Sequence, residues 1–169
     1  SLAAMQARMM LEQGIISEND MAEVVARSRR NAAANNPHAQ LSGDVSVEEL
    51  LQADTWVSPL RKHDCCPVSD GAAAMVVASV EQAQKWGLPY AVIKGIDHRI
   101  ETHNMGARDL TRSVSTELAA AAIGVSDGAV EVAEIYAPYS HQEHILKSAL
   151  GLGDDTEINP SGGVLAGNL

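Results

Sequence analysis

The second part of the chain alternates short apolar runs with amphipathic segments, and this alternation limits the fold more than any other feature. From residue 70 onward, strands are expected at residues 72–78, 90–97, 130–137 and near Glu157-Ile158. The helices expected between them end at Gly87, Gly124 and Gly151. An alternating order of strands and helices favours a mixed or parallel sheet with helices packed on it. The sequence therefore predicts an α/β fold.

The first sixty residues have a different, mainly helical pattern. Methionines and leucines at helical spacing predict a helix over residues 2–13. Capping-box pairs predict two further helices, one beginning at Ser17 and the other at Ser46. The composition changes near residue 64, so we divide the chain into a helical segment, 1–63, and an α/β unit, 64–169.

Charge and cysteine content exclude several classes of protein. The net charge is -10, with 22 carboxylates against 12 basic residues, whereas nucleic-acid binding needs clustered Lys and Arg. No apolar run reaches the ~20 residues of a membrane span. Cys65 and Cys66 are adjacent and cannot join distant segments, which fits a reducing compartment. We expect a cytoplasmic protein with neither a membrane span nor a nucleic-acid partner.

Residues 63–71 form the first of three patterns that could carry chemistry. The two cysteines in this stretch precede Pro67 and adjoin Asp64, whose negative charge would raise the pKa of a thiol. His63 and the two cysteines could be metal ligands, but no second cysteine pair completes a zinc site. We interpret the stretch as a structural turn and expect no metal.

The second pattern lies where the strand expected at 130–137 ends and a helix begins. Candidate acids, bases and oxyanion donors follow one another there, namely Tyr136, Tyr139, His141, Gln142 and Glu143. Ends of strands in α/β sheets commonly carry sites. Two simpler interpretations remain open: Ser140 and Glu143 fit a capping box, and Tyr136 fits a packed strand residue.

The third pattern is the glycine-rich turn at residues 159–168, which contains Gly162 and Gly163. Adjacent glycines let a backbone approach a ligand closely. The spacing is not that of a P-loop or a dinucleotide motif, and a tight turn with two glycines often needs no ligand. Both interpretations stay open.

Taken together and in this order, the three patterns resemble the thiolase superfamily, in the branch of sterol-carrier thiolases and lipid-transfer aldolases. That branch has a His-Asp-Cys-Phe-Ser-x-Asn-Glu run where this chain has residues 136–143, and Gly-His-Pro where it has Gly167-Asn168. The stretch through Asn35-Asn36-Pro37 resembles the family's loop domain. The resemblance implies the C-terminal half of a five-layered αβαβα fold.

The same resemblance implies acyl-CoA chemistry in lipid or sterol metabolism, with a coenzyme A thioester as substrate and no covalently bound cofactor. Tyr136 and Asn168 replace the usual histidines, and neither cysteine matches the family's nucleophile, so ordinary thiolysis is not expected. Aldolase relatives cleave a β-hydroxyacyl-CoA without an acyl-cysteine and can use tyrosine. By this resemblance the catalytic residues would be Tyr136, Tyr139 and Gln142, and the substrate-binding residues His141, Gly162, Gly163 and Asn168.

The alternative is a thiolase-like binding or assembly subunit without catalysis. Under either hypothesis the resemblance implies a homodimer or tetramer, and aldolase relatives often work with a small OB-fold partner. Half of such a fold would expose apolar faces on its own. We therefore expect the natural protein to be longer than this chain, and the 169 residues alone to be inactive.

Overall fold

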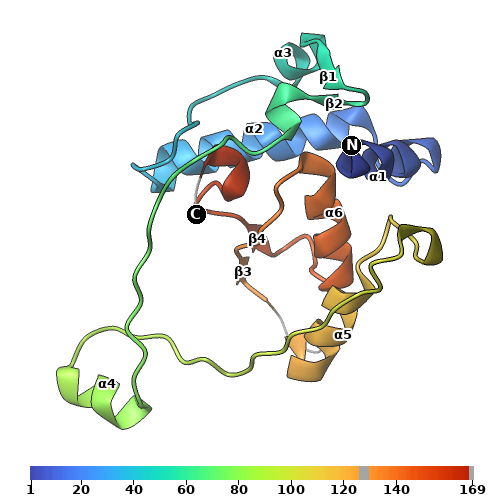
Figure 1. Cartoon of the computed structure of the whole chain (residues 1–169). Coiled ribbons are helices and arrows are strands. Elements are labelled where there is room, and N and C mark those ends of the chain that lie inside the picture. The colour runs from blue at the N-terminus through green and yellow to red at the C-terminus, as the bar shows by residue number, and fades with distance from the viewer. Residues whose placement is uncertain (126–129, 168–169) are drawn as a thin grey trace.

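The computed structural model describes residues 1–125 and 130–167. Helices α1, α2 and α6 lie together on one side of the molecule. Helix α4 stands apart from them on a long arm, which consists of residues 68–100 (Figure 1). The helices are α1 (Leu2–Glu12), α2 (Glu18–Asn35), α3 (Val47–Gln52), α4 (Val80–Trp86), α5 (Val114–Ile123) and α6 (Ser140–Ala149). The strands are β1 (Thr55–Val57), β2 (Leu60–Arg61), β3 (Val132–Ala133) and β4 (Glu157–Ile158). Short 3-10 turns occur at η1 (Lys62–Asp64), η2 (Met105–Ala107) and η4 (Val164–Ala166).

Helices α2 and α3 begin where their capping residues predict. Ser17 caps α2, and both reciprocal bonds of its capping box with Asp20 are present. Ser46 and Ser79 cap α3 and α4 through their hydroxyls. Among the described residues, no helix combines the length and apolar character needed to cross a bilayer.

The core consists of three apolar clusters built largely from small side chains. Alanines of α1 pack with Met10 and Met21 against Ile145 of α6. A second cluster joins α2, α3 and Leu165 of η4. The third cluster lies beside the β3–β4 pair and contains Ile135, Ala137 and Ile158. Small residues let these elements approach closely, so the core brings α2, α6 and the last turn into direct contact.

Two small sheets are present in the described part of the chain. Strands β1 and β2 form an antiparallel hairpin that the sequence did not predict. Strands β3 and β4 are parallel, with Val132 opposite Glu157 and Ala133 opposite Ile158. A parallel pair connected through a packed helix is an α/β arrangement, which confirms the predicted class. The strand expected over 130–137 is shorter than predicted.

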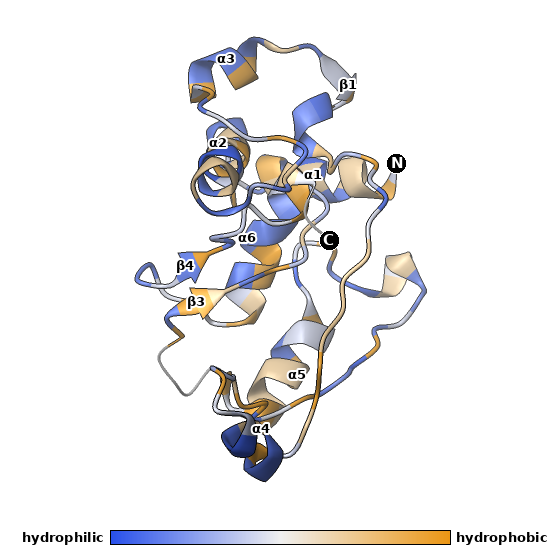
Figure 2. Ribbon diagram, turned by 90° about the vertical axis from the view of Figure 1, so that its left-hand side faces the viewer, coloured by the Kyte–Doolittle hydropathy of each residue, from blue (hydrophilic) through white to orange (hydrophobic). Residues whose placement is uncertain are grey.

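The strands expected at residues 72–78 and 90–97 are absent, so these two predictions are wrong for the described structure. Both stretches have an extended course without strand pairing, and they flank α4 on the arm (Figures 1 and 2). Val76 is 82% exposed and Ile96 is 89% exposed. A fully apolar strand needs neighbours at its edges and cover on its faces, and the described part of the chain supplies neither to this arm.

Candidate functional site

The first and second patterns lie against each other. Cys65 and Tyr139 form an isolated antiparallel bridge, and the amide of Cys66 donates to the carbonyl of Pro138 at 2.8 Å. The turn at residues 63–71 therefore packs along the segment that leads from β3 into α6. This placement agrees with its interpretation as a structural turn.

A buried carboxylate joins the two patterns more firmly. The Ser140 hydroxyl donates to Oδ1 of Asp64 at 2.6 Å, and the amide of Arg61 donates to Oδ2 at 2.8 Å. Ser140 and Asp64 are both buried. The capping-box interpretation of Ser140 and Glu143 is wrong, because α6 has Tyr139 as its N-cap without a side-chain capping bond. Ser140 instead satisfies a carboxylate from a distant part of the chain.

Asn159 joins the second pattern to the third. Its Oδ1 accepts from the amide of Ile135 at 2.6 Å, and its Nδ2 donates to Oε2 of Glu143 at 3.0 Å. The other oxygen of Glu143 pairs with Arg27 on α2. Asn159 and Glu143 are buried, so this network fixes the end of β3, the start of α6 and the glycine turn relative to α2.

A second contact also ties the strand end to the turn. The Glu134 carboxylate accepts from the amide and the hydroxyl of Ser161, both at 2.8 Å. The organising roles of Glu134, Asn159 and Arg27 could not be predicted from the sequence. Nothing in the local pattern distinguishes them from solvated polar residues, because their partners lie far away in sequence.

The two glycines of the turn are explained by packing. A Cβ built on Gly162 would lie 2.6 Å from the Cβ of Ala32 on α2, and its φ is +94°. The Ser28 hydroxyl donates to the carbonyl of the same glycine. A Cβ on Gly163 would lie 2.9 Å from Nδ2 of Asn159. Their contact with substrate stays a prediction, and Asn168 lies outside the described residues.

The two tyrosines differ in environment. Tyr136 is 72% exposed between the buried residues Ile135 and Ala137, so its ring points to the opposite side from the core. The interpretation of Tyr136 as a packed strand residue is therefore wrong. The Tyr139 ring packs against the α1 cluster, and its centroid lies 5.9 Å from that of His141.

His141 and Gln142 both meet α1. Nε2 of His141 lies 3.1 Å from Oε1 of Gln6, and Nε2 of Gln142 donates to the same oxygen at 3.0 Å. Burial, and then the nearby His144, lower the pKa of His141 to about 4, so its imidazole is neutral at pH 7. His141 is completely buried, behind Gln6 rather than on an open surface.

Cys65 is poorly placed for nucleophilic chemistry. Burial raises the pKa of the Cys65 thiol, and the charges of Asp64 and Cys66 raise it further. Asp64 thus acts on the thiol as the sequence predicts. In residues 1–125 and 130–167, no group of three or more His, Cys, Asp or Glu side chains is arranged to hold a metal.

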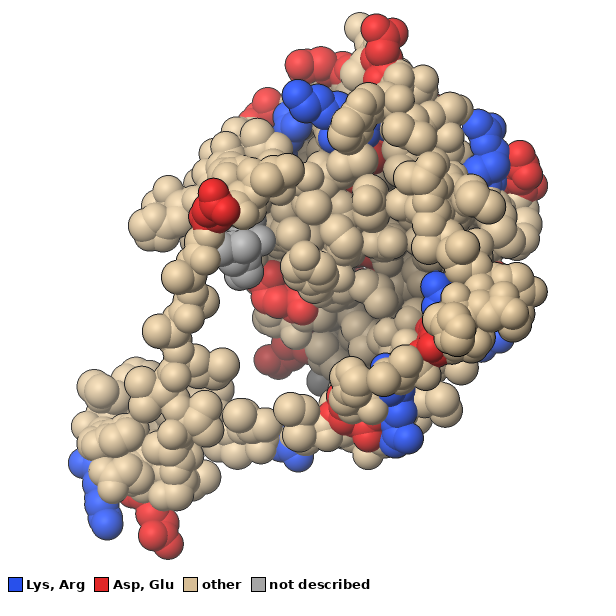
Figure 3. Space-filling view, in the orientation of Figure 1, with Lys and Arg blue, Asp and Glu red and all other residues tan. Residues whose placement is uncertain are grey.

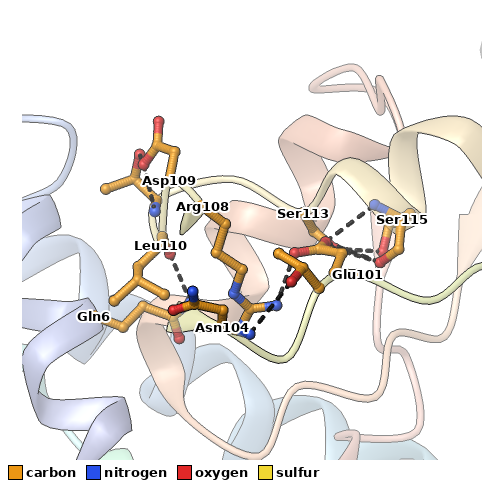
Figure 4. Close-up of polar contacts among 11 residues, drawn as sticks. Gln6, Glu101, Asn104, Arg108, Asp109, Leu110, Ser113 and Ser115 are labelled. Atoms are coloured by element: carbon orange, nitrogen blue, oxygen red, sulfur yellow. Dashed lines mark hydrogen bonds and ion pairs between the residues drawn. The ribbon is translucent and has the colours of Figure 1, made fainter. Parts of the chain in front are cut away.

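Two cavities lie elsewhere, along the segment 97–108 and helix α5. One of about 260 Å³ is lined by Asp97, Arg99 and residues of α5, and one of about 500 Å³ reaches from Leu2 to Arg108. Glu101 sits beside them, accepting from the amide of Ser115 at 3.0 Å and from Arg108 at 2.8 Å (Figure 4). Neither cavity includes Tyr136 or Gly162, so a hollow shared by the strand end and the glycine turn stays a prediction.

Known proteins that resemble this chain in sequence or in fold indicate its family. No protein-family model matches it. The structure of an Ltp2-ChsH2(DUF35) aldolase matches with a TM-score of 0.83 and 24% identity, over 96% of this chain and 50% of that chain. Benzoylsuccinyl-CoA thiolase subunit BbsB of Thauera aromatica is 34% identical over 156 residues, 88% of this chain and 40% of that protein. Sterol carrier protein 2 of Rattus norvegicus is 29% identical, over 79% of this chain and 29% of that protein.

The α/β fold is thus shared with an aldolase of known structure, and the sequence is similar to part of a thiolase subunit and part of a sterol carrier protein. The chain belongs to the thiolase superfamily, as the three sequence patterns predict. It spans less than half the length of these two curated relatives.

Proposed function

We propose that the protein acts on carbon-carbon bonds of acyl-CoA thioesters and that its reaction is the retro-aldol cleavage of a β-hydroxyacyl-CoA. The observation that carries this proposal is Tyr136, an exposed phenol at a strand end that buried polar contacts hold in place. It stands where the resemblance places a family histidine. The names of the matched thiolase and aldolase support the substrate class and the reaction type.

In this reaction a base removes the proton of the β-hydroxyl group. The bond between the α and β carbons breaks, the β carbon becomes a carbonyl, and the electron pair moves into the thioester enolate. Protonation of the α carbon then gives the shorter acyl-CoA. Tyr136 is our candidate for the group that exchanges these protons, with Tyr139 and Gln142 beside it on the same segment.

An acyltransferase mechanism is the less favoured form of the proposal. It needs a base that activates the acyl-accepting thiol, and by the resemblance Tyr136 and Asn168 stand where the family has its histidines. The retro-aldol route makes no such demand, because the thioester stays intact throughout. The two replaced histidines therefore favour aldol cleavage.

A non-catalytic binding or assembly role is the second candidate. One observation favours it: Gly162 and Gly163 are fully explained by packing against Ala32 and Asn159, without a ligand. In both cases we propose that the natural protein is longer than this chain and forms a homo-oligomer. In the aldolase case we also propose a small OB-fold partner. The exposed arm supports a larger assembly, because its apolar side chains lack cover in the described structure.

Replacement of Tyr136 by Phe tests the enzyme proposal. We expect Tyr136→Phe to lower cleavage of a β-hydroxyacyl-CoA by about 100-fold or more, since it removes a proton-transfer group. The assay measures the shorter acyl-CoA chromatographically, with the intact protein and any partner present. Tyr90→Phe is the matched control, because Tyr90 is also an exposed phenol but lies on the arm. Equal rates for the two variants would rule out Tyr136 as the proton-transfer group, and no cleavage by the unaltered protein would favour the non-catalytic role.

A further inference from the structure

Gln6 of α1 makes three side-chain hydrogen bonds that join separate parts of the chain. Its Nε2 donates to the carbonyl of Leu110 at 2.7 Å (Figure 4). Its Oε1 lies 3.0 Å from Nε2 of Gln142 and 3.1 Å from Nε2 of His141. One amide thus joins α1, α6 and the loop before α5.

These contacts determine which way each polar group faces. A backbone carbonyl only accepts, so the nitrogen of Gln6 must face Leu110 and its oxygen must face α6. An amide oxygen also only accepts, so Gln142 must present its nitrogen to Gln6. For the same reason His141 must carry its proton on Nε2.

This orientation leaves two acceptors unused. Nδ1 of His141 is unprotonated in this tautomer, and it is buried without a partner among the described residues. Oε1 of Gln142 has no hydrogen bond within the described part of the chain either, and its side chain is only partly buried. Gln142 therefore offers a carbonyl oxygen, a group that accepts from a hydroxyl and repels another carbonyl.

We propose that Gln6 is a positioning residue that turns Gln142 so that its amide oxygen accepts from the hydroxyl of a β-hydroxyacyl thioester. This proposal rests on the proposed function for its substrate, and it adds a preference for β-hydroxyacyl over β-ketoacyl thioesters. A β-ketoacyl chain offers an acceptor at the same carbon, so it gains nothing from Oε1. Gln6 acts through Gln142 without touching the substrate.

The tautomer of His141 tests the positioning role without any turnover. In ¹⁵N NMR spectra of the full chain, with His141 assigned by its loss in His141→Gln, we expect the Nε2–H form. Gln6→Met removes the acceptor and should shift His141 away from that form. Gln13→Met is the control, since Gln13 is an exposed residue that follows the same helix. An Nδ1–H form in the unaltered protein, or an unchanged His141 signal in Gln6→Met, would overturn the proposal.

A second variant keeps the test valid if Gln6→Met fails to fold. Gln6→Glu retains an acceptor oxygen for His141, so it should preserve the Nε2–H form while its carboxylate raises the pKa of the imidazole. A purely structural role for Gln6 predicts neither effect. If the pKa of His141 does not rise in a folded Gln6→Glu protein, Gln6 does not face the ring and the proposal is wrong.

Ligand binding tests the substrate preference separately. We expect Gln6→Met to reduce the ratio of affinities for 3-hydroxybutyryl-CoA and acetoacetyl-CoA about three- to tenfold, as loss of one oriented hydrogen bond implies. The ratio should not change in Gln13→Met. An unchanged ratio in Gln6→Met refutes the preference. The His141 tautomer and the affinity ratio are both measured without catalysis. An inactive protein would therefore count against the proposed function, while these two measurements would still test the role of Gln6.

Discussion

Four buried polar residues organise the candidate site at the residue scale: Asp64, Ser140, Glu143 and Asn159. Each has its hydrogen bonds satisfied by a partner from another segment, which is the condition for burying polar groups at low cost. Their effect is to fix the backbone on both sides of Tyr136. An exposed phenol on a rigid support is suited to repeated proton transfer, because little reorganisation is needed.

His141 makes the stability of the fold depend on pH in a defined direction. Its pKa falls from 6.5 to about 4 in the folded chain, chiefly through burial. As pH falls from 6.5, the unfolded chain takes up a proton that the folded chain refuses, so stability is lost until about pH 4. This loss amounts to about 3 kcal/mol at most.

We therefore predict that His141→Gln weakens the pH dependence of unfolding. A glutamine can still donate to Gln6 but does not titrate, so urea denaturation should show a smaller loss between pH 6.5 and 4 than in the unaltered protein. His38→Gln, at an exposed position, should leave the pH dependence as it is. A His141→Gln protein with an unaltered pH profile would contradict the neutral, buried state of this imidazole.

At the scale of elements, the glycine turn and helix α2 form one packed unit. Gly162 lies so close to Ala32 that α2 and the turn approach nearly to backbone contact, and Ser28 bonds to the turn. The turn also carries Asn159, which reaches the end of β3. Displacing the turn would therefore disturb the support of Tyr136.

Gly162→Ala is predicted to destabilise the fold by about 1 to 3 kcal/mol, because the new methyl group overlaps Ala32 in a packed core. The positive φ adds to the cost. Gly153→Ala is the matched control, since a Cβ there meets nothing within 4 Å, and we expect it to stay within about 0.5 kcal/mol of the unaltered protein. Equal midpoints of denaturation for the two variants would show that α2 and the turn are not packed as described.

Helices could be predicted from sequence better than strands, for a physical reason. Helices α2, α3 and α4 begin at residues whose own side chains cap them, so the signal is local. A strand is completed by partners elsewhere, and the apolar runs at 72–78 and 90–97 have none in the described structure. The hairpin β1–β2 has too few residues for a periodic pattern.

Only part of the candidate site could be predicted from the sequence. The motif positions of Tyr136 and Gln142 could be found from their order along the chain. The contacts of Asp64 with Ser140 and of Asn159 with Glu143 could not, because they depend on tertiary packing. The capping box predicted at Ser140 does not form, because the Ser140 hydroxyl bonds to the distant carboxylate of Asp64 and not to a backbone amide of α6.

The arm is the main feature at the scale of the whole molecule. Most of its surface is uncharged, with charged side chains gathered mainly near α4 (Figure 3). Met75, Val77 and Ile93 are all largely exposed. The match to the aldolase structure covers 96% of this chain, so it includes most of the arm. The shared fold therefore includes most of the arm, although the apolar runs of the arm lack strand partners within the described residues.

We propose that residues 134–142 and the turn at 159–163 form the region that meets an acyl-CoA thioester. Titration of the ¹⁵N-labelled protein with 3-hydroxybutyryl-CoA tests this directly. We predict that the largest amide shift changes occur in these two stretches, and that Tyr136→Phe reduces them while Tyr90→Phe does not. Changes concentrated around the cavities of segment 97–108, with none near Tyr136, would contradict the claim.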